Sequence, residues 1–119
     1  MPAARRKTAK RAPTIPDRGD VVWLDFDPQA DHEQGKRRPA LVLSPATYNR
    51  TGLALFCPIT SQVKGYPFEV PFPAGGRIQG VVLSDQVRNL DWIARSADPI
   101  TTAPVTVVAG TLRQVRKLL

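Results

Sequence analysis

The chain has 119 residues, enough for one domain with a modest hydrophobic core. Its 17 lysines and arginines outweigh 10 aspartates and glutamates, and the net charge of +7 favours a polyanionic partner such as nucleic acid, an acidic protein segment or a membrane surface. The lone Cys57 excludes an internal disulfide, and no cysteine–histidine spacing suits zinc. Without a secretory signal or an apolar run approaching the roughly 18 residues of a membrane span, we expect a cytoplasmic protein with no cofactor and no membrane contact.

The first segment of the chain, residues 1–17, is basic. Residues 1–18 hold six basic side chains and one acidic side chain, and so carry +5 of the net charge. Almost no large apolar residue occurs among them, so the segment cannot bury enough surface to offset its ordering entropy. We predict a disordered tail over residues 1–17, whose simplest role is non-specific RNA affinity, and a folded domain over residues 18–119.

The folded part is predicted to be mainly β. Short apolar or β-branched and aromatic runs indicate strands at 21–26, 40–43, 53–59, 66–72, 80–87 and 92–96. Pro67 and Pro71 confine the fourth of these to an edge or irregular strand, and turns are expected at 48–52 and 73–76. Many short strands in a small chain cannot leave long open edges, so a curled, barrel-like sheet is the economical arrangement.

The C-terminal residues change to a helical period. Thr102 is a candidate cap for a helix that begins near Pro104. Apolar residues then recur at spacings of four, three and four, at Val108, Leu112, Val115 and Leu119. This stripe predicts a short helix that packs one face against the sheet.

Two side chains beside the predicted strands suit phosphate chemistry. The guanidinium of Arg38 can bind two phosphate oxygens at once, and Pro39 favours an extended backbone for it at the start of a buried strand. The alternative is a surface arginine paired with Asp27 or Glu33. Thr60 follows an apolar run where a strand emerges, and its hydroxyl can donate to a phosphate oxygen or relay a proton.

Four segments, at 18–26, 33–39, 57–61 and 65–70, read RGDVVWLDF, EQGKRRP, CPITS and GYPFEV. In this order they resemble the MazF/PemK family of toxin endoribonucleases over roughly residues 17–98. The resemblance implies an SH3-like small barrel with a short C-terminal helix. It also implies a homodimer, a cognate acidic MazE-like antitoxin, and sequence-specific, metal-independent cleavage of single-stranded RNA by an mRNA interferase of a type II toxin–antitoxin system.

The chemistry implied is attack of the RNA 2′-hydroxyl on the adjacent phosphorus, which needs a proton acceptor, a cation and a proton donor. The resemblance assigns phosphorane stabilisation to Arg38, a phosphate hydrogen bond to Thr60 and an assisting role to Glu33, whose alternative is a solvated loop carboxylate. Substrate contacts are expected from Phe26, Gln34, Lys36, Ser61, Lys64, Gln86 and Arg88.

Other residues received weaker or structural interpretations. Arg37 and Arg95 are further candidate substrate contacts, while the isolated His32 is not favoured as a general base. Tyr66 is a candidate for base stacking. Asp85 is expected to orient its neighbours, and core packing is the favoured role for Trp23, Phe68 and Trp92.

Two other classes stay open. The same toxin fold occurs in proteins that poison DNA gyrase by binding, for which an Arg38–Thr60 pair would have no use. A non-catalytic RNA- or chromatin-binding SH3-like module is the second, and its main support is the basic tail. RNA turnover distinguishes both from a nuclease.

Overall fold

The computed structural model describes residues 14–26 and 37–119. Its strands are β2 (Asp20–Asp25), β3 (Arg37–Val42), β4 (Leu53–Thr60), β5 (Glu69–Pro71), β6 (Val81–Leu83), β7 (Arg88–Asp91) and β8 (Asp98–Thr102). Its helices are α1 (Ala46–Asn49), the 3-10 turn η3 (Ser84–Gln86) and α2 (Val105–Arg116). The prediction of a mainly β chain with a C-terminal helix is confirmed.

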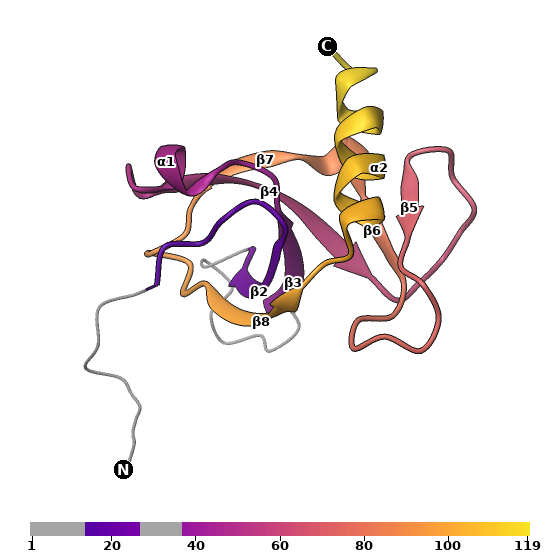
Figure 1. Ribbon diagram of the computed structural model, residues 1–119, viewed down its shortest axis with the longest axis horizontal. Coiled ribbons are helices and arrows are strands. Elements are labelled where there is room, and N and C mark those ends of the chain that lie inside the picture. The colour runs from indigo at the N-terminus through magenta and orange to yellow at the C-terminus, as the bar shows by residue number, and fades with distance from the viewer. Residues whose placement is uncertain (1–13, 27–36) are drawn as a thin grey trace.

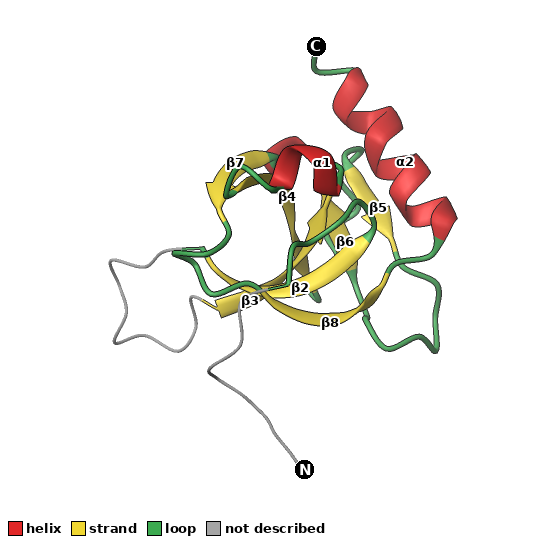
Figure 2. Ribbon diagram, turned by 60° about the vertical axis from the view of Figure 1, so that its left-hand side comes forward, coloured by secondary structure: helices red, strands yellow, loops and turns green. Residues whose placement is uncertain are grey.

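All the strands pair antiparallel, in the order β5-β6-β4-β3-β2-β8, with β7 also on β4. The sheet curls on itself, and α2 stands beside β5 and β6 at one end (Figure 1). In the turned view the strands enclose a barrel-like interior with α1 over one rim (Figure 2). The curled sheet therefore agrees with the small barrel expected from the sequence.

Strand β4 is the centre of this arrangement. Its residues 56–58 pair with β3 on one edge, while residues 53–56 and 59–60 pair with β7 and β6 on the other. Pro58, which has no N–H to donate, lies within the break between the β7 and β6 ladders. The turn η3 connects β6 to β7 at this break and reaches the sheet surface there. The broken ladder thus opens space beside the end of β4.

The core has two parts because the central strands are buried on both faces. Under α2, the first part contains Val21, Leu41, Leu43, Cys57, Ile59, Val70, Val82, Ala103 and Val107. The barrel interior contains Val22, Leu24, Ala40, Val42, Ala54, Phe56, Leu90 and Trp92. Each fully buried aliphatic or aromatic side chain contributes about 1.5–3 kcal/mol of transfer free energy. Continuous burial of residues 40–43 confirms the interpretation of that run as a doubly covered strand.

The predicted strand at 92–96 is wrong, because these residues form turns between β7 and β8. The carboxylate of Asp91 accepts the N–H groups of Ile93 and Ala94, at 3.0 and 2.9 Å. Trp92 is buried and donates its indole N–H to the carbonyl of Asn49 at 2.8 Å, which confirms its core role. The aromatic and β-branched residues of this segment suggested a strand, but Trp92 is buried although its backbone forms a turn.

Three other element predictions need correction. Of residues 66–72 only Glu69–Pro71 is a strand, and of residues 80–87 only Val81–Leu83 is one, before η3. Thr102 does not cap α2, whose N-cap is Pro104 with no side-chain cap hydrogen bond. The helix buries Val107 and Thr111, while Leu119 is 96% exposed.

Pro16 and Asp17 contact the barrel, although both stand inside the stretch assigned to the tail. Pro16 is buried, and its carbonyl accepts the side-chain N–H of Asn49 at 2.7 Å. Asp17 accepts the N–H of Ala46 at 2.8 Å and thereby caps α1. None of the helices in the described part of the chain is long and apolar enough to cross a membrane.

Candidate active site

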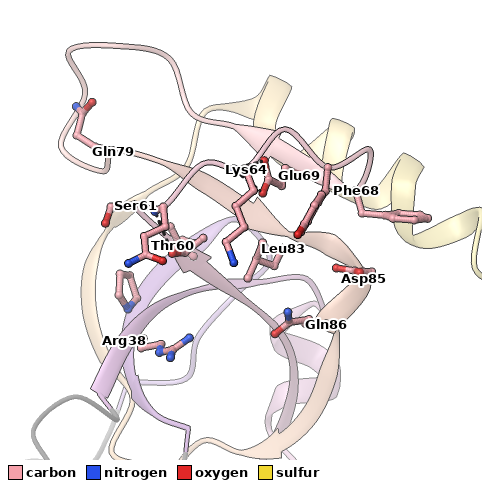
Figure 3. Close-up of a pocket in the computed structure, with 14 residues that line it drawn as sticks. Arg38, Thr60, Ser61, Lys64, Phe68, Glu69, Gln79, Leu83, Asp85 and Gln86 are labelled. Carbon is pink, nitrogen blue, oxygen red and sulfur yellow. Dashed lines mark hydrogen bonds between the residues drawn. The ribbon is translucent and has the colours of Figure 1, made fainter.

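An open pocket of about 590 Å³ lies where β3, β4 and β6 end and η3 crosses the sheet. Figure 3 shows it with side chains from four separate stretches of the chain. These are Arg38 and Pro39; Ile59, Thr60, Ser61, Gln62, Lys64, Tyr66, Phe68 and Glu69; Gln79; and Leu83, Asp85 and Gln86. Most of the polar ones are exposed, so a long flexible ligand can reach them from solvent.

Arg38 and Thr60 reach the pocket from neighbouring strands. The β3–β4 ladder ends with Ala40 paired to Pro58, and Arg38 lies two residues before Ala40 while Thr60 lies two residues after Pro58. Both side chains line the pocket. Residues 14–26 and 37–119 contain no carboxylate paired with Arg38; Asp27 and Glu33, its alternative partners, lie outside the described residues. The pocket lining therefore includes both a cation and a hydroxyl.

The Thr60 hydroxyl is oriented by its own backbone. Its oxygen accepts the N–H of Gln62 at 3.1 Å, which leaves the hydroxyl hydrogen to donate elsewhere. Gly80 lies against the Thr60 backbone: a Cβ atom on Gly80 would come 2.1 Å from the Thr60 carbonyl oxygen, and the φ angle of Gly80 is +114°. Only glycine fits this approach without strain. The close contact fixes the end of β4 on β6.

Lys64 and Gln86 complete the polar lining with Ser61. Figure 3 shows the ammonium of Lys64 and the amide of Gln86 pointing into the same space as the Arg38 guanidinium. Two carboxylates also line the pocket, but that of Glu69 accepts backbone N–H groups of the 64–65 turn. Cationic, hydroxyl and amide groups thus converge on a volume that suits a phosphodiester and a base.

Two predicted substrate contacts lie outside this lining. Arg88, on β7, stacks over the ring of Phe26 with its guanidinium carbon 5.9 Å from the ring centroid. Phe26 also packs partly against the barrel core. Phe26, directly after β2, and Arg88, the first residue of β7, therefore contact each other rather than joining the residues around Arg38. Glu33, Gln34, Lys36 and His32 lie outside the described residues.

Arg37 and Arg95 bond to the barrel backbone and lie outside the pocket lining, and their substrate contacts stay predictions. Arg37 pairs with Asp25 at 3.0 Å and donates to the carbonyl of Ser96 at 2.9 Å. Arg95 donates to the carbonyls of Asp25 and Phe26, at 3.2 and 2.7 Å. Both guanidinium groups tie the 92–97 turns to the end of β2.

Trp23 was expected in the core, and this is wrong: it is 42% exposed. Its neighbours Val22 and Leu24 are buried in the barrel interior. Because successive side chains of a strand point to opposite faces, Trp23 points outward, where it pairs with Pro39 of β3. Phe68 is half-buried and lines the pocket.

Cys57 is buried under the pocket floor, in the core beside Ile59. Burial, together with the nearby carboxylate of Asp85, raises the pKa of its thiol to about 12. The thiol is therefore protonated near neutral pH, which agrees with the structural role expected from sequence. In the described ranges no three histidine, cysteine, aspartate or glutamate side chains gather as a metal-binding group.

Sequence reasoning missed Glu69, Gln62, Gln79 and Gly80. Glu69 belongs to the segment GYPFEV at 65–70. Because strand side chains alternate and Val70 is buried, the sequence indicates only that Glu69 lies on the outer face of the strand. Its bonds to the 64–65 backbone depend on how the preceding loop turns. Gly80 likewise shows its role only when β6 is seen against Thr60.

The curled antiparallel sheet with one covering helix defines a small β-barrel protein with an open polar pocket at its strand ends. A family model for the PemK-like, MazF-like toxin of type II toxin–antitoxin systems matches residues 17–119. The chain belongs to this family.

Three relatives illustrate the match. The chain is 52% identical to the endoribonuclease toxin MazF of Escherichia coli K12 over 84 residues, 70% of this chain and 75% of the relative. It is 41% identical to the endoribonuclease toxin ChpB of the same strain over 108 residues, 87% and 93% of the two chains. A MazE–MazF crystal structure from Deinococcus radiodurans (Form-II) shares 54% identity with a TM-score of 0.82, covering 89% of this chain and 96% of that one. These similarities confirm the fold class and favour a nuclease over the two open alternatives.

Proposed function

We propose that this MazF-like endoribonuclease toxin is an mRNA interferase that cleaves single-stranded RNA, sequence-specifically and without a metal, in the pocket around Arg38. The observation that carries the proposal is that Arg38 and Thr60 line one pocket from the neighbouring strands β3 and β4. Two rigid strands hold the two groups, so they are positioned before substrate binds.

The reaction is a transesterification. The 2′-oxygen of the RNA forms a new bond to phosphorus and loses its proton, the bond from phosphorus to the 5′-oxygen breaks, and that oxygen gains a proton. The products are a 2′,3′-cyclic phosphate, which water can open to a 3′-phosphate, and a 5′-hydroxyl. Arg38 stabilises the charge on the phosphorane and assists proton transfer, and Thr60 donates a hydrogen bond to a non-bridging oxygen. Glu33 is assigned the assisting proton transfer, as the family resemblance implies.

Substrate binding is assigned to both sides of the reacting phosphate. Ser61, Lys64 and Gln86 share the pocket with Arg38 and suit phosphate oxygens and an extruded base. Phe26 and Arg88 form a separate stacked pair that suits a second base or phosphate. Gln34 and Lys36 are kept as further contacts from the 33–39 segment.

The partners proposed are those of a toxin. A MazF chain of Deinococcus radiodurans is solved with MazE, which supports a cognate acidic antitoxin for this chain. We expect it to compete with RNA for the pocket around Arg38. A homodimer is supported by an apolar groove of about 340 Å³ whose lining includes Leu43, Leu55 and Leu112. Sedimentation of the purified toxin tests the dimer directly.

Two finer assignments complete the proposal. The toxin domain is assigned to residues 18–119 and the basic tail to residues 1–17, supported by a family match that starts at residue 17. Cytoplasmic action is assigned because messenger RNA, the proposed substrate, is there.

The test is incubation of the protein in excess EDTA with a long single-stranded RNA, beside the Arg38→Ala variant. Discrete cuts with 5′-hydroxyl ends, lost in a folded variant, are expected. A substrate with one 2′-deoxy nucleotide at the cut site should resist. Cleavage of that substrate at the normal rate would overturn the mechanism, and no cleavage of any RNA by folded protein would overturn the proposed function.

A further inference from the structure

The turn that carries Lys64 is closed by one carboxylate. Glu69, the first residue of β5, accepts the N–H of Gly65 at 2.8 Å with one oxygen, and both of its oxygens lie within 3.2 Å of the N–H of Lys64. The backbone N–H of Glu69 donates in turn to the carbonyl of Tyr66 at 3.1 Å. A single residue therefore holds the backbone on both sides of the 64–66 turn.

The geometry of the turn favours an anion at this place. Gly65 has a φ angle of +82°, and the consecutive N–H groups of Lys64 and Gly65 converge on one acceptor, as in a backbone nest. Hydrogen bonds to an ionised carboxylate are roughly twice as strong as neutral ones. The Glu69 carboxylate thus stabilises the turn through its hydrogen bonds with the N–H groups of Lys64 and Gly65.

Little else in the described structure fixes this loop. Residues 61–67 are all exposed, with Val63 at 63% and Tyr66 at 61%, so apolar burial contributes little to their position. The other side-chain contact to the loop backbone is the Thr60 hydroxyl on Gln62, at the opposite end. Glu69, by contrast, is half-buried and stands on β5, which pairs with β6. The sheet is therefore connected to the turn through the Glu69 carboxylate.

What the turn carries is functional in the proposed reaction. Lys64 points from the turn into the space shared with Arg38 and Gln86 (Figure 3), and Tyr66 lines the same pocket. Arg38 and Thr60 are held by β3 and β4, independently of the turn. Loss of the Glu69 carboxylate would therefore release Lys64 while leaving the groups at the reacting phosphate in place.

We propose that Glu69 is a positioning residue that places Lys64 over the pocket and thereby sets RNA affinity. The inference rests on the proposed function of the pocket. The proposal predicts the direction in which RNA affinity changes when the Glu69 carboxylate is removed. Removing a carboxylate beside a polyanion's binding site should strengthen binding by simple charge. If Glu69 acts through the turn, its removal weakens binding instead.

The experiment measures KM and kcat on a short RNA containing the cleavage sequence. We expect Glu69→Ala to raise KM about 10-fold with kcat changed less than about 3-fold, and Glu69→Gln, which keeps one acceptor oxygen, to lie between it and wild type. Asp98→Ala is the matched control, because it removes an exposed carboxylate outside the pocket lining with the same change of net charge. It should leave KM the same or lower.

A double-mutant cycle with Lys64→Ala tests whether Glu69 affects KM through Lys64. Since Glu69 acts through Lys64, adding Glu69→Ala to Lys64→Ala should raise KM by no more than about 2-fold further. Full additivity, or a lower KM in Glu69→Ala, would overturn the positioning role. A thermal midpoint lowered in step with kcat would show a merely structural role and overturn it as well. If wild-type protein cuts no RNA, the proposed function fails first, so the two failures are distinguishable.

Discussion

Arg38 and Thr60 line one pocket from neighbouring strands, each two residues beyond the Ala40–Pro58 pair that ends the β3–β4 ladder. Pro39, between Arg38 and the paired Ala40, has no N–H to donate to a ladder. The two side chains therefore enter the pocket beyond the last pair of the two strands. The chemistry proposed for the pocket depends on this arrangement, and each group can be tested separately.

Arg38→Lys keeps the charge but loses the planar fork that binds two phosphate oxygens. We expect kcat to fall about 100-fold in this variant and about 1,000-fold or more in Arg38→Ala, with the thermal midpoint unchanged because Arg38 is exposed. Single-turnover cleavage of a defined RNA measures this loss.

Arg37→Ala is the matched control for the adjacent arginine. Arg37 pairs with Asp25 at 3.0 Å, so the variant should lose about 0–1 kcal/mol of stability and keep kcat within about 3-fold. If Arg37→Ala were as inactive as Arg38→Ala, the separate roles given to the two arginines would be wrong.

Thr60→Val removes the hydroxyl with little change of shape, whereas Thr60→Ser retains it. We expect Thr60→Val to lower kcat roughly 10- to 100-fold, because it loses a hydrogen-bond donor to the phosphate. Thr60→Ser should stay within about 5-fold of wild type, since its oxygen can still accept the N–H of Gln62. Equal activity of the valine and wild-type proteins would remove Thr60 from the mechanism.

Gly80→Ala tests the backbone contact behind Thr60. The added methyl group would stand 2.1 Å from the Thr60 carbonyl oxygen, so β6 must move away from β4. We expect a loss of at least ~2 kcal/mol of unfolding free energy together with reduced kcat.

Gly75→Ala provides the comparison for Gly80→Ala. Gly75 also has a positive φ angle, +84°, but nothing lies within 4 Å of its added Cβ. Its cost should be near 1 kcal/mol, with normal kcat. Urea unfolding separates the two variants, and equal losses would show that φ strain alone explains both.

Much of this structure follows from local sequence pattern, and the failures have identifiable causes. Strands at 21–26 and 53–59 were predicted because their apolar residues alternate or run continuously into a core. Trp92 was predicted buried but in a strand, since side-chain composition does not distinguish a strand from a turn whose indole reaches inward to Asn49. At Trp92, therefore, hydrophobic content predicted burial but not backbone conformation.

Candidate site residues could be predicted where the chemistry of the side chain alone indicates a role. They were missed where the role depends on strand register or on loop conformation. Arg37 and Arg38 look equivalent in sequence, but adjacent strand residues face opposite sides, and only β2–β3 pairing shows that Arg37 meets Asp25. Glu69 and Gly80 act through backbone atoms of residues brought close by loops. No periodicity in the sequence reports such contacts.

Cys57 should be unreactive in the folded protein. Burial, with the carboxylate of Asp85 beside it, raises the pKa of its thiol to about 12, so almost no thiolate is present at pH 8. Alkylation by iodoacetamide should be roughly 100-fold or more slower than in denaturant. An exposed thiol supplied by Ala74→Cys in a Cys57→Ala background is the control and should react at the denatured rate; fast labelling of native Cys57 would contradict its burial.

Asp17 should make the stability of the domain depend on pH at the acid end. Hydrogen bonds from the N–H groups of Ala46 and Arg18 lower the pKa of its carboxyl below 3.8 in the folded chain. As the pH falls through that range, the unfolded chain binds more protons than the folded chain. The stability that the ionised Asp17 carboxylate contributes is therefore complete above the pKa of the unfolded chain, and it is lost as the pH falls through the pKa of the folded chain. Asp17→Asn should be less stable than wild type at pH 6, and the difference should shrink below about pH 4. Asp98→Asn, which changes an exposed carboxylate, should show no such trend; a pH-independent difference for Asp17→Asn in urea titrations would contradict the capping role of the charge.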